Sequence, residues 1–122
     1  MADLKVLDLT PFVPAKDFAL SKRFYLDLGF KEVLSIAKAV RLELDGRGFW
    51  LPDYYVEDWA GNFMFCLYVR DINAWAAKIK AMAFRDTYGG TARLINEPHP
   101  QEGGLMMQFS DPSGVLWHIR HD

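Results

Sequence analysis

The sequence contains two segments that follow the same plan, 54 positions apart. Residues 17–30 read DFALSKRFYLDLGF and residues 71–84 read DINAWAAKIKAMAF. Each begins with an Asp, a good helix N-cap, and ends with a Phe after a dozen mostly helix-forming residues, so each predicts a capped helix followed by a strand. A chain made of two copies of one unit buries one face of each copy against the other. The boundary between the copies is then a natural place for a cleft.

Two turns repeat as well. Residues 45–48 (DGRG) run into Phe49 and Trp50, and residues 111–114 (DPSG) run into a segment that ends in Trp117. Gly and Asp in these positions suit tight turns between strands. The second turn is therefore interpreted as structural.

Hydrophobic periodicity gives the order β-α-β-β-β in each copy. We expect a single domain over residues 1–122, with one module at about 4–52, a linker at 53–61 and a second module at 62–120. The helices should bury apolar stripes, and Trp75 and Trp117 are expected in the core. The segment 96–104 is predicted to be a loop, because it holds two Pro and two Gly. The predicted strands are 6–13, 30–36, 39–44, 48–51, 62–69, 91–95, 105–109 and 115–119.

Composition excludes several classes of function. The net charge of −2 and the absence of a basic run argue against nucleic acid as a partner. Cys66 is the only cysteine, so neither an intrachain disulfide nor a cysteine zinc cluster is expected. No apolar run reaches membrane-spanning length, and we expect a cytoplasmic protein with no membrane partner.

The motif S-x-x-F-Y-x-x-L-G-F at residues 21–30 and the D-P-x-G turn at residues 111–114 resemble the vicinal oxygen chelate superfamily. This superfamily includes glyoxalase I, extradiol dioxygenases, fosfomycin-resistance enzymes and bleomycin-resistance proteins. The resemblance implies an α+β fold in which two βαβββ modules pair into a curled mixed sheet around a cleft, with the helices on the outer face. It also implies a homodimer.

Enzymes of that superfamily hold a divalent metal with four side chains, and the resemblance carries these positions onto this chain. They fall near Asp8, near Leu51 or Pro52, on or next to Met64, and on His118. Leu51 and Pro52 have no ligating group, and Met64 offers only a soft thioether, whereas such a site needs three or four N or O ligands. We therefore expect no metal and no cofactor, with Asp8, Met64 and His118 as degenerate metal positions.

The likeness is greatest to the bleomycin-resistance branch, in which the last strand also carries a His after a D-P-x-G turn. It implies a protein of the antibiotic-resistance type that is not an enzyme and that sequesters a small aromatic compound at a dimer interface. The aromatic residues after the fourth strand alternate with Asp53, Glu57 and Asp58, which favours a cationic ligand. The resemblance places Met64 and His118, two of the family's metal positions, on the face of the cleft. Alternation from these positions, together with the rim after residue 50, gives ten candidate ligand-binding residues: Phe12, Trp50, Tyr54, Tyr55, Trp59, Met64, Cys66, Tyr68, Leu116 and His118.

Other functions stay open from the sequence. The chain could be a metal-dependent lyase or dioxygenase of the glyoxalase type, with Asp8, His118 and either Glu43 or His99 as a rearranged ligand set. It could instead be a module whose cleft is filled by its own side chains and which serves dimerisation. The identity of the ligand, and whether modules pair within one chain or swap between chains, are not fixed by the sequence.

Overall fold

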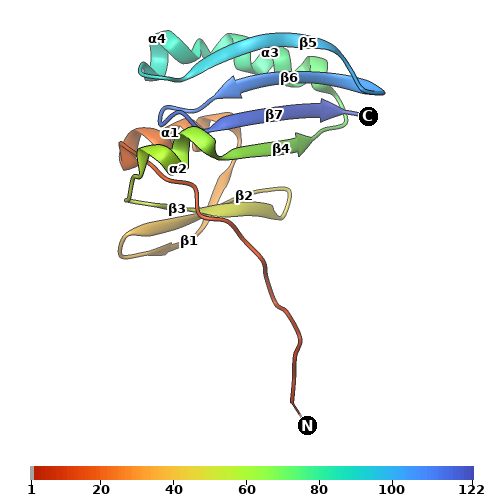
Figure 1. Cartoon of the computed structure of the whole chain (residues 1–122). Coiled ribbons are helices and arrows are strands. Elements are labelled where there is room, and N and C mark those ends of the chain that lie inside the picture. Colours follow the sequence, from red (N-terminus) through yellow and green to blue (C-terminus); the bar gives the residue numbers. More distant parts are fainter. Residues whose placement is uncertain (1) are drawn as a thin grey trace.

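The structure is a computed structural model that describes residues 2–122, and it contains two separate sheets with helices (Figure 1). The first sheet has the antiparallel order β1-β2-β3, and the second has the mixed order β4-β7-β6-β5, in which β4 and β7 are parallel. The predicted α+β architecture is therefore confirmed. The strands are β1 Lys31–Ile36, β2 Ala39–Leu44, β3 Arg47–Pro52, β4 Met64–Tyr68, β5 Arg93–Gln101, β6 Gly104–Ser110 and β7 Leu116–His121.

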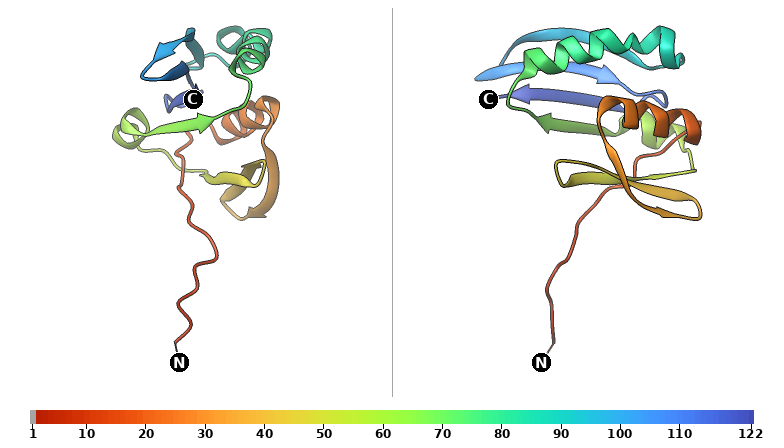
Figure 2. Two further views of the ribbon diagram at one scale, coloured as in Figure 1. Left: turned by 90° about the vertical axis from the view of Figure 1, so that its right-hand side faces the viewer. Right: turned by 180° about the vertical axis from the view of Figure 1, so that it is seen from behind.

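The two predicted helices form where the repeated Asp residues stand. The carboxylate of Asp17 accepts a hydrogen bond from the Leu20 N–H at the start of α1 (Phe18–Leu28), and Asp71 does the same for Ala74 in α3 (Ile72–Met82). These side chains satisfy N–H groups that the first helical turn leaves unpaired. Both helices lie on the same side of the sheets (Figure 2). Two shorter helices were not predicted: α2 (Glu57–Asn62), which begins in the expected linker, and α4 (Phe84–Tyr88), which follows α3.

Aromatic side chains of both modules form one shared core. Phe24 of α1 contacts Phe84 of the second module with 4.7 Å between ring centroids. Tyr25 contacts Phe49 of the first module at 4.9 Å and Trp117 of the second at 5.8 Å. Burying a large apolar side chain stabilises the fold by about 1.5–3 kcal/mol, so these contacts hold the two copies together.

The turn at residues 111–114 is a buried junction between the modules. The Tyr25 hydroxyl donates to Asp111 Oδ2 at 2.5 Å, and the N–H groups of Ser113 and Val115 donate to Oδ1 at 2.8 and 2.9 Å. Trp117 Nε1 donates to the Tyr25 oxygen at 2.9 Å. Burial raises the pKa of Asp111 to about 6, although these hydrogen bonds oppose the shift. Burial, and then the Asp111 carboxylate, raise the pKa of Tyr25 well above its ordinary value.

The prediction of a strand at residues 6–13 is wrong except at its end. Only Phe12 pairs, in an isolated parallel bridge with Trp50, supported by Val13 N–H to Trp50 O at 2.9 Å and Trp50 N–H to Pro11 O at 3.0 Å. Residues 2–9, here called the N-terminal arm, extend away from the body of the molecule (Figure 1). Pro11 lacks an N–H for a ladder, and the apolar side chains of the arm find no core within the chain. The exposed fractions are 87% for Leu4, 76% for Val6, 89% for Leu7 and 94% for Leu9.

The loop predicted at residues 96–104 is wrong for most of its length, because β5 continues to Gln101. This strand lies at the edge of the second sheet, where a proline removes no hydrogen bond that a neighbour needs. Its pairing with β6 is irregular on either side of Asn96, between Leu94 and Asn96 and between Asn96 and His99. Edge position, which the local composition does not reveal, therefore allows Pro98 and Pro100 in a strand.

Candidate functional site

The second sheet has one face packed against α3 and one face without a helix. Along β7, Trp117 and Ile119 are buried in the shared core, while the residues between them point to the other side. The same alternation in β6 buries Met107 and Phe109. We call the uncovered side the open face. Its residues are Met64, Cys66 and Tyr68 of β4, Leu116, His118 and Arg120 of β7, Met106 and Gln108 of β6, and Asn96 of β5.

Five of the candidate ligand-binding residues lie together on this open face. In the parallel pairing of β4 with β7, Met64 is opposite Leu116 and Cys66 is opposite His118, and Tyr68 comes next along β4. Met64 is 61% exposed and Tyr68 is 66% exposed. Neighbouring large apolar and aromatic side chains that face solvent are typical of a surface that binds a ligand or a partner.

Arg120 gives the open face a fixed positive charge at the end of β7. Its Nε donates to Asp122 Oδ1 at 2.9 Å, and Nη2 donates to the Gln101 carbonyl at 2.9 Å. The hydrogen bond to Asp122 raises the pKa of Arg120. Beside it, a hydrogen bond with Cys66 raises the pKa of the Tyr68 hydroxyl, so this phenol is a neutral donor at physiological pH.

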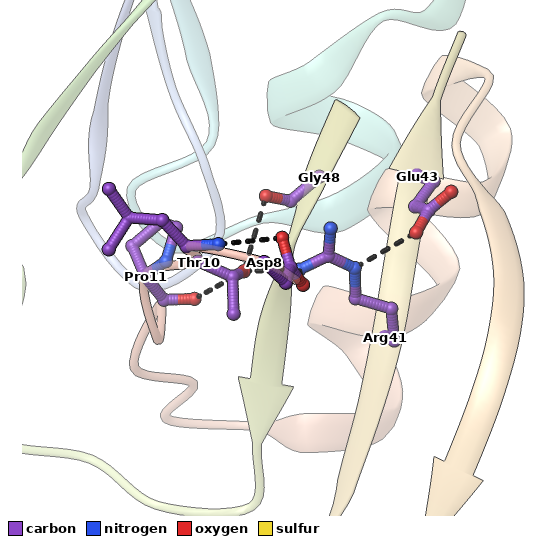
Figure 3. A network of polar contacts seen from close by, with 7 residues as sticks. Asp8, Thr10, Pro11, Arg41, Glu43 and Gly48 are labelled. Atoms are coloured by element: carbon purple, nitrogen blue, oxygen red, sulfur yellow. Dashed lines mark hydrogen bonds and ion pairs between the residues drawn. The ribbon is translucent and has the colours of Figure 1, made fainter. Parts of the chain in front are cut away.

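Two further candidates, Phe12 and Trp50, lie on the first sheet, where their rings stack with centroids 6.4 Å apart. Trp50 is opposite Arg41 in the register of β2 and β3. Arg41 is 8% exposed, and it contacts the root of the N-terminal arm (Figure 3). Its Nη1 donates to Thr10 Oγ1 and lies 3.5 Å from Asp8 Oδ2, while its Nε donates to Glu43 Oε2 at 3.1 Å. These pairs fix the direction in which the arm leaves the sheet.

The predicted rim divides into an exposed and an inward part. Tyr54 is 56% exposed and its ring is 6.1 Å from that of Trp59. The Trp59 ring in turn lies 6.2 Å from the ring of Phe63. Tyr55 instead packs against the core, with Lys16 Nζ 5.8 Å from its ring centroid. Tyr54 and Trp59 can therefore reach a ligand, whereas Tyr55 supports the loop from beneath.

The structure does not assemble the rearranged metal site. Asp8 contacts Arg41 at the first sheet, and His118 lies on the open face of the second. Glu43 is paired with Arg41, and His99 is a half-buried residue of β5. Within residues 2–122, no three His, Cys, Asp or Glu side chains are close enough to hold a metal ion. No helix in the same part of the chain has the length and hydropathy needed to cross a bilayer.

A pocket of about 270 Å³ lies at the seam between β3 and β4, the boundary that the duplication predicts. Its walls come mainly from core aromatics, including Phe30, Phe49 and Phe65, with Arg47 at the side. Cys66 and Tyr68 are the only candidate residues that it shares with the open face. The pocket is thus lined by both sheets, but Phe12 and Trp50, the candidate residues of the first sheet, do not line it.

The ten candidate residues leave out four residues of the open face, of which alternation along the last strand already places Arg120 on the same side as His118. Met106 and Gln108 could have been found, because alternation along the predicted strand 105–109 separates them from Met107 and Phe109. Asn96 was hidden by the prediction of a loop, since its place on a face depends on the edge strand β5. The contacts of Arg120 with Gln101 and Asp122 depend on tertiary structure.

Comparisons with known proteins agree with this fold. The profile described as "Glyoxalase/Bleomycin resistance protein/Dioxygenase superfamily" matches residues 9–119. A bleomycin resistance protein of Klebsiella pneumoniae is 31% identical over 115 residues, which cover 90% of this chain and 88% of that protein. A crystal structure of a bleomycin-binding protein complexed with bleomycin is 27% identical, with a TM-score of 0.78, over 96% of this chain and 99% of that one. A bleomycin resistance determinant encoded on the transposon Tn5 is 26% identical, with a TM-score of 0.79, over 96% and 98% of the two chains.

Proposed function

We propose that this chain, which belongs to the glyoxalase/bleomycin resistance protein/dioxygenase superfamily, binds and sequesters a small aromatic compound and is not an enzyme. The observation that carries the proposal is the open face of the second sheet. It exposes Met64 and Tyr68 beside His118 in a chain that is 31% identical to a bleomycin resistance protein. A planar ligand can stack on the Tyr68 ring and contact the polarisable thioether of Met64.

The ligand is proposed to be cationic. Asp53, Glu57 and Asp58 are exposed and stand beside Tyr54 and Trp59 in the sequence, and these two rings lie 6.1 Å apart. A cation over the face of an aromatic ring gains roughly 0.5–2 kcal/mol, and carboxylates at the mouth of a site increase the rate of encounter with a cation. These acidic residues can thus attract the ligand, while the rings supply the contact surface.

A second copy of this chain is proposed to complete the cleft. The four apolar side chains of the N-terminal arm are at least 76% exposed, and such a row is stabilised only when a partner covers it. The edge of the first sheet also exposes Val33, Leu34 and Ile36. In a two-fold dimer, the arm of each copy can lie on the other copy, and the first sheet of one can face the open face of the other. Phe12 and Trp50 would then approach a ligand from the side opposite Tyr68.

Binding is tested by isothermal titration of the purified protein with metal-free bleomycin, with and without EDTA. We expect binding that EDTA does not change, and a rise in melting temperature at saturating ligand. Tyr68→Ala is expected to weaken binding about tenfold, as the loss of an aromatic anchor does. Leu26→Ala, on the outer surface of α1, is the matched control and should leave the affinity unchanged. Absence of binding to bleomycin and to other planar cations would refute the proposal, and affinity that disappears with EDTA would favour the metal-dependent alternative.

A further inference from the structure

The three histidines of this chain differ in what their Nδ1 atoms contact. Nδ1 of His99 lies 2.9 Å from the Glu97 carbonyl, and Nδ1 of His121 lies 3.1 Å from the Val69 carbonyl. A carbonyl can only accept, so both rings carry a proton on Nδ1 when they are neutral. Nδ1 of His118 instead lies 3.3 Å from the side-chain nitrogen of Gln108. An amide nitrogen can only donate, and this contact indicates the opposite tautomer.

A backbone group determines the orientation of that amide. The N–H of Gln108 lies 2.7 Å from Asn96 Oδ1, and a backbone N–H requires an acceptor. Asn96 therefore directs its Nδ2 to the Gln108 side chain, 2.9 Å from Oε1. With Oε1 engaged as an acceptor, Gln108 presents Nε2 to His118. The two amides and the imidazole thus form a chain of hydrogen bonds, called the relay below. Its direction follows from one unambiguous donor, the backbone N–H of Gln108.

Met106 offers His118 a competing partner, because its sulfur lies 3.4 Å from the same Nδ1. A proton on Nδ1 could be donated to this thioether, but it would then oppose the N–H of the Gln108 amide. A thioether is a weak acceptor, whereas a buried polar group without a partner costs about 1–3 kcal/mol. The relay therefore decides the tautomer, and Met106 remains a packing contact.

We propose that Asn96 and Gln108 are positioning residues that hold neutral His118 with its proton on Nε2, so that His118 donates a hydrogen bond to the ligand on the open face. The inference rests on the proposed function for its ligand. Within residues 2–122, the hydrogen-bond contacts of the His118 ring are all made by Nδ1, which leaves Nε2 free for a ligand. The ligand must carry an acceptor, such as an amide carbonyl, next to its aromatic part. Tyr68 and His118 lie on neighbouring strands, so together they select for a ligand that carries a ring and a hydrogen-bond acceptor side by side.

The tautomers can be read in the free, full-length protein by long-range ¹H–¹⁵N NMR at a pH of about 8.5, where imidazoles are neutral. We expect His118 to show a protonated Nε2, and His99 and His121 to show a protonated Nδ1. The decisive variant is Asn96→Asp, which does not touch His118. A carboxylate there accepts from both the backbone and the side chain of Gln108, which turns the amide and presents Oε1 to His118. The His118 tautomer should therefore invert.

Asn73→Asp on α3 makes the same change of charge outside the relay, and it should leave all three tautomers as they are in the parent protein. A protonated Nδ1 on His118 of the parent protein, or an unchanged tautomer in Asn96→Asp with its fold intact by circular dichroism, would overturn the inference. Gln108→Glu is a second route to the same inversion if Asn96→Asp fails to fold, because its carboxylate accepts directly from Nδ1.

Titration with metal-free bleomycin separates this inference from the proposed function. The Nε2–H resonance of His118 should shift on binding, and those of His99 and His121 should not. Binding that leaves His118 unperturbed would refute its role toward the ligand and leave the proposed function intact. The predicted tautomer without any binding would refute the proposed function and leave the relay intact.

Discussion

The two modules contain the same parallel strand pair, but only one of them completes it. In the second module Cys66 is opposite His118 within five consecutive pairs of β4 and β7. In the first, Phe12 stands 54 positions earlier, at the equivalent place, and it forms a single bridge with Trp50. Before β4 the chain folds back as α2, whereas before Phe12 it leaves as the exposed N-terminal arm. One copy of the repeat thus pairs its first strand over five residues, whereas the other pairs a single residue and leaves the arm before it exposed.

The repeated turns differ in the same manner. Asp45 is an exposed hairpin residue with a φ of 51°, and Asp111 is fully buried with its carboxylate accepting from both modules. The same residue type thus shapes a turn in one module and forms a polar junction in the other. Sequence similarity between the copies identifies equivalent positions, and burial decides what each position does.

The largest effect is expected from removing the N-terminal arm. A chain without residues 2–9 should be monomeric and should bind bleomycin at least tenfold more weakly, because the proposed cleft needs both copies. Sedimentation velocity gives the oligomeric state, and titration gives the affinity. The variant Lys5→Ala keeps the apolar side chains and serves as the control. A parent protein that is already monomeric, or a truncated chain that still dimerises, would refute the proposal that the arm of the first module holds two copies together.

A smaller but still large effect is expected at the buried turn. Asp111→Ala leaves the Tyr25 hydroxyl and two buried N–H groups without an acceptor, each at about 1–3 kcal/mol, and should lower the free energy of unfolding by at least 3 kcal/mol. Asp45→Ala places an alanine at positive φ and should cost about 1–2 kcal/mol. Urea denaturation measures both, and equal losses would contradict the contrast between the turns.

The pH dependence of stability tests the same carboxyl. Asp111 has a folded-state pKa of about 6 against an ordinary value of 3.8, so the folded protein holds this proton more tightly than the unfolded chain. Its favourable contribution is therefore complete below about pH 4 and is lost as the pH rises through 6, by about 3 kcal/mol in total. Denaturation from pH 4 to 8 should show this loss in the parent protein relative to Asp111→Asn. A constant difference between the two proteins over that range would be inconsistent with a raised pKa.

The smallest effect is expected from a substitution on the first sheet, which tests whether both sheets contact the ligand. If a ligand lies between the first sheet of one copy and the open face of the other, Trp50→Ala should weaken bleomycin binding by about 1 kcal/mol, in the range of Tyr68→Ala. Titration of both variants, with confirmation that each is still a dimer, gives the comparison. An unaltered affinity in Trp50→Ala would restrict the site to the second sheet.

Much of this protein follows from its sequence because the relevant interactions are local. The Asp caps, the helical stripes and the tight turns act within a few residues, and the alternation along β4 and β7 places Met64, Cys66 and Tyr68 with Leu116 and His118. That Leu51 and Pro52 cannot hold a metal also follows from residue chemistry, since neither side chain has a ligating atom.

Tertiary structure decided the rest. Pro98 and Pro100 belong to a strand because β5 is a sheet edge, and residues 6–9 do not because nothing in the chain covers them. The burial of Asp111 and the Asn96–Gln108–His118 relay join segments distant in sequence, so their hydrogen bonds form only after the sheets have assembled. A sequence specifies the conformations that neighbouring residues impose on one another. Dielectric environment, partner groups and exposure come from what the whole chain packs around each side chain, and these set the proton of His118 and the charge of Asp111.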